Sequence, residues 1–587
     1  MRLLMFLAER PGQVVGIAEL LDGVWGKAVV TPHSVYEAIA ALRHSLGDTA
    51  EKPVYVATLP RRGYRLVAPV ERLPDEQPTH DTGVTVTGAH SEEQRPGSDG
   101  SRPWSLILMG AVAAIAVALA IAWFLQKGSK GGPSTQADKS IAVLPFVDLS
   151  ETKDQEYFAD GLAEELLDVL VNVPGLRVIG RTSSFQFRNK NEDVRSIGKK
   201  LDAAYIVEGS VRHDGTQIRV AAQLIRAIDG VHQWSGTYTR HIEDTLVLES
   251  ELATALGRAL ELSVESNAEL NRIKTSSGQA NDHYMRGLHE LDSHSRPGTE
   301  EAVNQFQAAL ALDPQFSAAA VSLGMAHYVR AAFSFVPPQT GFPQVAEDAL
   351  NALKLDPRSA TAHALLARVA TLHTWDWNEA RRQSELALAM DSQNPFALFA
   401  AGDLASVLGD FERAEHLFRA ALASDPLNPE THYMLALVLP DAGRIQEGEQ
   451  EARQCLTISP TYVFGHYLLA AFLMGKDGEA AVDECRREAL EGGQKSCLAQ
   501  AYYALGRTKE SDTSLQEAIE THGHDQAYLI AAAFAYRGDA NSALQWLNRA
   551  YDQRDPLLQY VKSSPEFDPL KDDARFKVLL QRMNLPE

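Results

Sequence analysis

An uninterrupted apolar run of 22 residues, at positions 104–125, constrains this chain more than any other feature of its sequence. The run holds no charged residue and no Pro. As a helix it would span roughly 33 Å, enough to cross the hydrocarbon core of a bilayer. It is too long and too far from the N-terminus for a cleaved signal peptide, and a buried core helix would carry polar positions on one face. The run therefore predicts a transmembrane helix.

The charges beside this run do not orient it. Arg95 and Arg102 precede it, whereas Lys127, Lys130 and Lys139 follow it. An excess of Lys and Arg marks the cytoplasmic side, and this count leans slightly toward a cytoplasmic C-terminal part. The orientation has to come from what the two flanking regions do.

Residues 1–70 are predicted to form three helices and a β-hairpin. Thr31 suits the N-cap of the third helix, Pro32 suits its first turn, and its buried stripe is formed at helical spacing by Val35, Ile39, Leu42 and Leu46. Strands are expected at 54–58 and 64–67. The turn between them carries Arg61 and Arg62, which suit contact with DNA phosphates or the minor groove.

This segment resembles the winged helix-turn-helix domain of OmpR-type regulators, in the form found in membrane-anchored ToxR/CadC-like regulators. The resemblance rests on PGQVVGIAELLDGVWG, SVYEAIAALRHSLGD and YVATLPRRGYRLVAPV. It implies that the helix from Thr31 enters the major groove and that the Arg61–Arg62 wing reaches the adjacent backbone. The residues expected to contact DNA are Thr31, His33, Ser34, Tyr36, Glu37, Arg43, His44, Arg61 and Arg62.

Two of these residues have alternative roles. Glu37 could accept a hydrogen bond from a cytosine amino group, although a solvated charge is the favoured interpretation. Arg43 could contact phosphate or brace the fold. Members of the family usually begin with a small sheet and a fuller first helix, so we expect an N-terminally truncated domain.

Residues 71–103 are rich in Pro, Gly, Ser, Thr and acids, and predict a disordered tether. Acidic charge dominates the rest of the chain. Residues 1–70 carry eight Lys and Arg against six Asp and Glu, whereas the whole chain has a net charge of −22. This balance argues against nucleic acid contacting the C-terminal part.

Residues 139–265 predict a small α/β domain. Strands are expected at 139–150, 176–181, 203–212, 218–227 and 231–240, and a helix at 156–172. The segment resembles the TolB N-terminal-like or FlgO-like domain in IAVLPFVDLS, FADGLAEELLDVL, RTSSFQF, YIVEGSVR and WSGTYTR, which implies no catalysis. Gly161 and Gly209 lie in no phosphate-loop motif, and nothing supports a triad of Ser183, His213 and Asp214.

Residues 280–587 repeat with a period of 34 residues. This spacing separates Asp391, Asp425 and Ser459; Pro395 and Pro429; and Ala380, Ala414 and Gly448. It is the tetratricopeptide pattern of paired antiparallel helices, and it predicts a solenoid that binds a protein or peptide on its concave face. Trp375, Trp377 and Trp546 are expected in the core.

The three cysteines, Cys455, Cys485 and Cys497, are too few for a disulfide framework. A Cys485–Cys497 bridge would require an oxidising compartment, and free buried thiols are favoured.

The sequence therefore predicts a multidomain α+β protein, with a winged helix at 1–70, a linker at 71–103, a membrane helix at 104–125, an α/β domain at 139–265 and a tetratricopeptide array at 280–587. We expect a non-enzymatic, single-pass inner-membrane transcriptional regulator, with a cytoplasmic N-terminus and a periplasmic sensory region. Its expected partners are double-stranded DNA, the membrane, an unknown protein or peptide and a second copy of the chain; no cofactor or metal is expected. The alternative is a membrane-tethered scaffold with a degenerate DNA-binding domain. A nucleotide cyclase is disfavoured because no segment is left to form one.

Overall fold

The computed structural model describes residues 2–8, 10, 13–20, 24, 38–39, 42–43, 48, 54–59, 63–68 and 139–585, the last range with gaps at 152, 172, 174, 191, 215–216, 242–244, 261–274, 294 and 334. The chain divides into two compact units, residues 1–124 and 125–587, each described here by itself. The predicted linker at 71–103 and the apolar run at 104–125 lie outside the described residues. Within those residues, no helix has the length and apolar character needed to cross a membrane.

The first unit contains short helices and the predicted hairpin. Its elements are α1 (Arg2–Ala8), α2 (Ile17–Leu20), β1 (Val56–Leu59) and β2 (Gly63–Leu66). The two strands pair antiparallel, with Leu59 opposite Gly63. Val15 and Tyr64 exchange two backbone hydrogen bonds of 2.8 and 2.9 Å, which adds a short bridge that the sequence did not predict. Leu7, Leu20, Ile39, Val56 and Tyr64 form the buried core.

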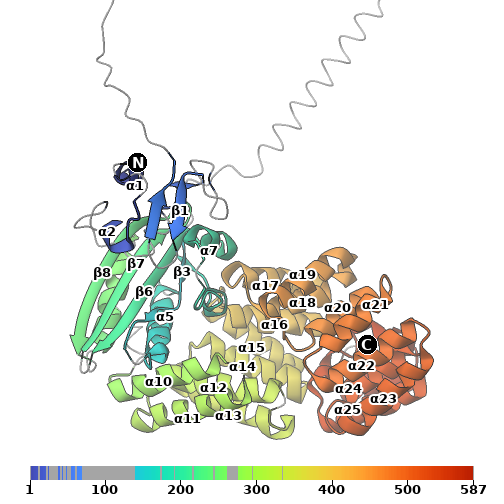
Figure 1. The fold of residues 1–587 in the computed structure, drawn as a ribbon. Helices are drawn as coiled ribbons and strands as arrows, with labels where there is room; N and C mark the ends of the chain where they lie inside the picture. The colour runs from blue at the N-terminus through green and yellow to red at the C-terminus, as the bar shows by residue number, and fades with distance from the viewer. Residues whose placement is uncertain are drawn as a thin grey trace, which may run out of the picture. The chain divides into compact units, whose positions relative to one another are not determined.

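The second unit begins with a mixed sheet in the order β5-β3-β6-β7-β8, with β4 also paired to β6 (Figure 1). The strands are β3 (Ser140–Val143), β4 (Val147–Asp148), β5 (Arg177–Val178), β6 (Tyr205–Asp214), β7 (Gln217–Arg226) and β8 (Val231–His241). β3, β4 and β5 join the sheet in parallel, and β6, β7 and β8 are antiparallel. All the predicted strands are present.

Helices cover both faces of this sheet. They are α5 (Glu156–Val171), α6 (Arg181–Phe185), α7 (Val194–Leu201) and α8 (Thr245–Ala259). Ile141 and Val143 of β3 pack with α5 and α8, whereas Ala142 and Leu144 pack with α7. This alternation follows from the two-residue period of a strand. The helix at 156–172 was predicted, whereas α6, α7 and α8 were not.

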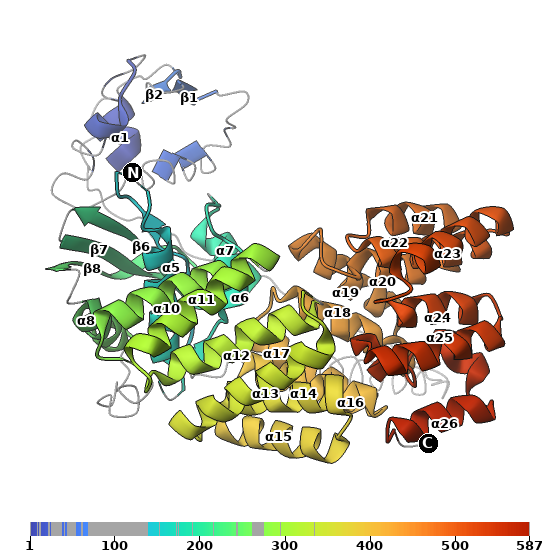
Figure 2. The same ribbon diagram turned by 90° about the horizontal axis from the view of Figure 1, so that it is seen from below.

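Paired helices fill the rest of the second unit in a curved array (Figures 1 and 2). They are α10 (Gly278–Leu291), α11 (Arg296–Leu312), α12 (Ser317–Ala332), α13 (Pro338–Leu355), α14 (Ala360–Val369), α15 (Trp377–Met390), α16 (Pro395–Val407), α17 (Phe411–Ser424), α18 (Pro429–Val438), α19 (Ile445–Ile458), α20 (Gly465–Met474), α21 (Gly478–Arg487), α22 (Glu491–Ala504), α23 (Thr508–His522), α24 (Ala527–Tyr536), α25 (Ala540–Gln553) and α26 (Ala574–Arg582). Short π or 3-10 turns are η3 (Ala370–Thr374), η4 (Pro440–Ala442), η5 (Pro556–Tyr560) and η6 (Pro565–Leu570).

The 34-residue period marks the ends of these helices. Asp391, Asp425 and Ser459 are the residues that follow α15, α17 and α19. Pro395 and Pro429 are the first residues of α16 and α18, where a missing N–H costs no helical hydrogen bond. The repeat prediction is confirmed for this part of the array.

The first helix of the array also belongs to the core of the α/β domain. Met285 of α10 packs among the side chains of α5 and the sheet. A Cβ at Gly161 of α5 would lie 2.4 Å from the Met285 side chain, so glycine permits this close approach. The role of Gly161 is therefore helix packing.

Two tryptophans close the array by joining its first half to its end. Trp375 lies 5.1 Å from the ring of Tyr551, and Arg554 lies 4.2 Å above Trp375. The Trp377 indole donates a 2.9 Å hydrogen bond to the Met583 carbonyl. Both indoles are buried in one cluster with α24, α25 and α26, and Trp546 packs against it, as the sequence predicted.

The cysteine interpretation was wrong for one pair. Cys485 and Cys497 form a disulfide between the adjacent helices α21 and α22, whose Cα atoms lie 5.4 Å apart at these positions. The sequence could not show this because the pairing depends on how the two helices pack. Cys455 is free and buried, and burial raises the pKa of its thiol to about 12.

We predict that Trp377→Ala destabilises the second unit by about 3–5 kcal/mol because it empties a core site. Trp377→Phe, which keeps most of the packing but leaves the Met583 carbonyl without its donor, should cost about 1 kcal/mol. Urea unfolding followed by circular dichroism measures both changes. Trp546→Phe is the control, and a loss in Trp377→Ala no larger than in the control would contradict closure through Trp377.

Candidate functional sites

The predicted DNA-contacting surface is described at one residue. Arg43 donates from Nε and Nη2 to the Val56 carbonyl, at 3.1 and 2.7 Å, and from Nη2 to the Thr58 hydroxyl at 2.8 Å. These bonds tie its helical segment to β1, which agrees with the bracing role. The other expected contacts lie outside the described residues: Thr31, His33, Ser34, Tyr36, Glu37, His44, Arg61 and Arg62. Their roles in DNA binding stay predictions.

A buried carboxylate, not identified from the sequence, holds the base of the same hairpin. Asp48 is 8% exposed and accepts hydrogen bonds from the backbone N–H groups of Val54, Tyr55 and Val56, at 2.7, 3.0 and 2.8 Å. A carboxylate that accepts several backbone N–H groups forms strong, charge-assisted bonds. Arg43 and Asp48 therefore fix the strand that leads to the arginine turn. The sequence signal was an Asp a few residues before a strand, which is also common in turns.

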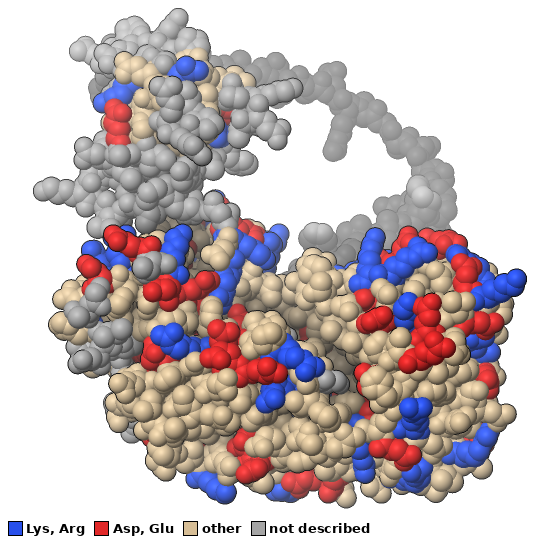
Figure 3. Space-filling model, turned by 60° about the horizontal axis from the view of Figure 1, so that its bottom comes forward, with Lys and Arg blue, Asp and Glu red and all other residues tan. Residues whose placement is uncertain are grey.

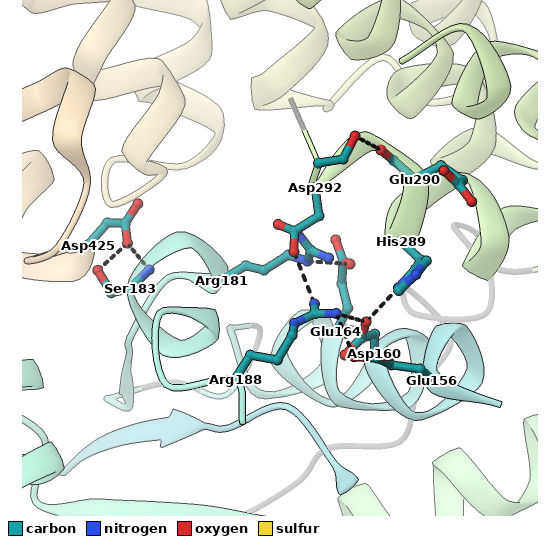
Figure 4. Close-up of polar contacts among 11 residues, drawn as sticks. Glu156, Asp160, Glu164, Arg181, Ser183, Arg188, His289, Glu290, Asp292 and Asp425 are labelled. Carbon is teal, nitrogen blue, oxygen red and sulfur yellow. Dashed lines mark hydrogen bonds and ion pairs between the residues drawn. The ribbon is translucent and has the colours of Figure 1, made fainter. Parts of the chain in front are cut away.

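A charged cluster joins the α/β domain to the first repeat (Figure 4). Arg181 pairs with Asp292 at 2.6 Å and with Glu164 at 2.7 Å. Arg188 pairs with Asp160 at 2.6 Å and with Asp292 at 3.0 Å. Asp292 thus bridges two arginines that come from a different part of the sequence, and it links α10 to the segment after β5.

Burial and pairing shift the pKa values of this cluster. Burial raises the pKa of the Glu164 carboxyl to about 7, although Arg181 opposes this rise. The hydrogen bond from His289 Nδ1 to Asp160, at 2.7 Å, raises the pKa of the His289 ring. The cluster therefore holds two groups that exchange protons near neutral pH.

A second contact joins the α/β domain to a later turn of the array. Asp425, between α17 and α18, accepts hydrogen bonds from the Ser183 N–H at 2.8 Å and from the Ser183 hydroxyl (Figure 4). The Ser183 hydroxyl in turn accepts one from the Leu427 N–H at 2.7 Å. Ser183 is buried and engaged in docking, which agrees with rejecting a catalytic triad at this residue.

The inner side of the array holds a cavity of about 1500 Å³. It is lined by α5 and α6, by the first helices of successive repeats, and by η5 near the C-terminus. Figure 3 shows the surface hollowed between the earlier and the later repeats. Aromatic rings are prominent in its lining, among them Tyr328, Phe396, Tyr433 and Tyr462.

Comparison with protein families places three models on the chain. The C-terminal domain of transcriptional regulatory proteins matches residues 1–66, the second domain of HilA/YgeH-like transcriptional regulators matches 137–246, and a tetratricopeptide repeat matches 399–463. The resemblance of 139–265 to a TolB N-terminal-like or FlgO-like domain stays a prediction.

Curated proteins match parts of the chain. The transcriptional activator CadC of Escherichia coli is 46% identical over 13% of this chain and 15% of its own length. The transcriptional regulator HilA of Salmonella typhimurium is 24% identical over 63% and 56%. A Rhizobium meliloti protein named "Putative adenylate cyclase 3" is 34% identical over 33% of each chain. The chain thus spans between 15% and 56% of the length of these relatives.

These matches support a DNA-binding transcriptional regulator. The regulator relatives favour a protein that is not an enzyme, although one relative carries the name of a cyclase.

We predict that the contact between α5 and α10 weakens as the pH rises above about 6.5, the ordinary pKa of histidine. Because the pKa of His289 is raised in the folded state, its stabilising effect is complete below that value and is lost as the pH rises through the folded pKa. Hydrogen exchange of α10 amides, corrected for the intrinsic rate at each pH, measures this opening. His289→Asn keeps a donor to Asp160 but cannot titrate, so this component should vanish. An unchanged pH profile in His289→Asn would refute the assignment.

Proposed function

We propose that this chain is a single-pass inner-membrane, one-component transcriptional regulator. Its N-terminal winged helix binds promoter DNA in the cytoplasm, and its α/β domain and repeats form a periplasmic sensory region. The observation that carries the proposal is the order of the parts: a domain matched to transcriptional regulators, then a 22-residue apolar run, then a repeat array. DNA lies on only one side of the membrane, so the first domain orients the run.

The disulfide supports the placement of the repeats. Bridges such as Cys485–Cys497 form and persist in oxidising compartments such as the periplasm, and they are rare in the cytosol. This observation is independent of the DNA-binding domain and favours the same orientation, against the slight lean of the charges beside the run.

Signalling in this proposal needs no enzymatic relay. Self-association or reorientation of the sensory region would bring two DNA-binding domains together on tandem half-sites. Affinity would rise through effective concentration without any new base contact. The polar contacts of Asp292 and Asp425 let the α/β domain and the repeats act together in this step.

We predict that Arg61→Ala with Arg62→Ala weakens DNA binding by the full chain and makes its salt dependence shallower by about one to two in the log–log slope, because each phosphate contact contributes about 0.9. Fluorescence anisotropy across a salt series measures the slope. The control is Arg486→Ala with Arg487→Ala, an adjacent exposed pair on α21. Arg43→Ala should instead lower stability by about 1–3 kcal/mol. Wild-type chain that binds DNA with no salt dependence would favour the tethered-scaffold alternative.

We predict that maleimide–polyethylene glycol labels one cysteine per chain, Cys455, when cells are denatured in the reagent without reduction. Reduction before labelling should raise the number to three, as should expression in cells that lack periplasmic thiol oxidation. A gel shift counts the labels, and Cys455→Ala should remove the label seen without reduction. Three labels without reduction in ordinary cells would argue against a periplasmic repeat array.

A further inference from the structure

The cavity inside the array has a strongly acidic lining. Ten Asp and Glu residues line it, against three Arg residues. Burial raises the pKa of three of these carboxyl groups, those of Glu164, Asp425 and Asp555. Even with these three protonated, carboxylates outnumber guanidinium groups by seven to three. The cavity therefore attracts cations and repels anions.

One carboxylate lies where the aromatic side chains gather. Glu430 precedes Tyr433 by one helical turn on α18, and Tyr433 packs against Tyr462 at 5.5 Å. Burial raises the pKa of the Tyr462 hydroxyl, and the neighbouring charge of Glu430 adds to this rise. An acidic group among aromatic rings is a favourable setting for a Lys or Arg side chain, because the ring faces attract cations.

The nearest guanidinium does not cancel this charge. Arg368 pairs with Asp403, which is fully buried behind the lining and also accepts a 2.6 Å hydrogen bond from Tyr560. Arg368 is thus balanced within the protein, and Glu430 adds a further negative charge. The same side of the cavity offers an acceptor that awaits a donor. Gln559 is 1% exposed, and its side-chain oxygen has no hydrogen-bond partner among the described residues.

The size of the cavity favours a chain segment over a small molecule. Pockets for drug-sized ligands measure roughly 300–1,000 Å³, and this cavity measures about 1500 Å³. Its lining alternates aromatic side chains with acidic ones along successive helices, which suits an extended peptide.

We propose that the cavity binds an extended segment of a partner protein in which Lys or Arg stands among apolar residues. The cationic side chain approaches Glu430 between the aromatic rings, and an N–H group of the segment donates to Gln559. This inference gives a partner class to the sensory region of the proposed function, on which it rests only for its biological role.

The test uses the full chain in nanodiscs of zwitterionic lipid, so that the membrane does not attract basic peptides. Three peptide pools share randomised apolar positions and differ at one fixed position, which is Lys, Gln or Glu. Mass spectrometry of the retained peptides gives the enrichment of each pool. We expect at least a tenfold enrichment of the Lys pool over the Gln pool, and depletion of the Glu pool.

Glu430→Gln should bring the ratio of Lys to Gln pools close to one. Gln559→Leu should reduce retention of all three pools. Glu412→Gln, at an exposed position on α17, removes the same charge outside the cavity and should leave the ratio unchanged. Because each ratio compares pools on one sample, a loss of folded protein does not alter it.

Equal retention of the three pools by the wild-type chain would overturn the inference, as would equal effects of Glu430→Gln and Glu412→Gln. Salt-dependent DNA binding, measured on the same preparations, separates this failure from failure of the proposed function. Intact DNA binding without peptide selection sinks only the peptide site.

Discussion

The cavity exists because Trp375 and Trp377 hold the end of the array against its first half. Repeat helices alone form an open coil, whose inner face stays exposed to solvent. The buried indoles, and the bond from Trp377 to the Met583 carbonyl, fix the distance between early and late repeats. Trp375 has a left-handed backbone at the end of a π-helical turn, with φ of 54°. Such a backbone is costly for a bulky residue and persists only where the surroundings over-determine it.

Polar contacts, by contrast, govern how the α/β domain meets the repeats. Arg181 and Arg188 share Asp292, and Ser183 shares Asp425 with the turn that contains it. Groups of this kind contribute little to stability beyond what they lose in hydration, but they define one arrangement. A junction held mainly by charge is also open to change by protons or by a bound cation, whereas the aromatic closure is not.

Much of the fold follows from the sequence because it depends on local patterns. The 34-residue spacing of Asp391, Asp425 and Ser459 located helix ends, and alternating strands at 203–240 located the sheet. The docking role of Ser183 and the bridging role of Asp292 could not be predicted, since their partners lie far away in the sequence. The same holds for the Cys485–Cys497 bridge and for Glu430, whose setting depends on helices from several repeats. Of the predicted DNA contacts, Arg43 shows a hydrogen-bonding role in the hairpin itself.

The two docking points of the α/β domain have a consequence for how this array can evolve. Met285 and Asp292 anchor the domain at the first repeat, and Asp425 anchors it again several helix pairs later. The domain therefore spans the intervening arc like a chord of fixed length. Tetratricopeptide arrays commonly gain or lose whole units, since each unit contacts only its neighbours. Between α10 and α18 such a change would move one anchor away from its partner, so the number of repeats in that interval is locked by the domain that bridges it.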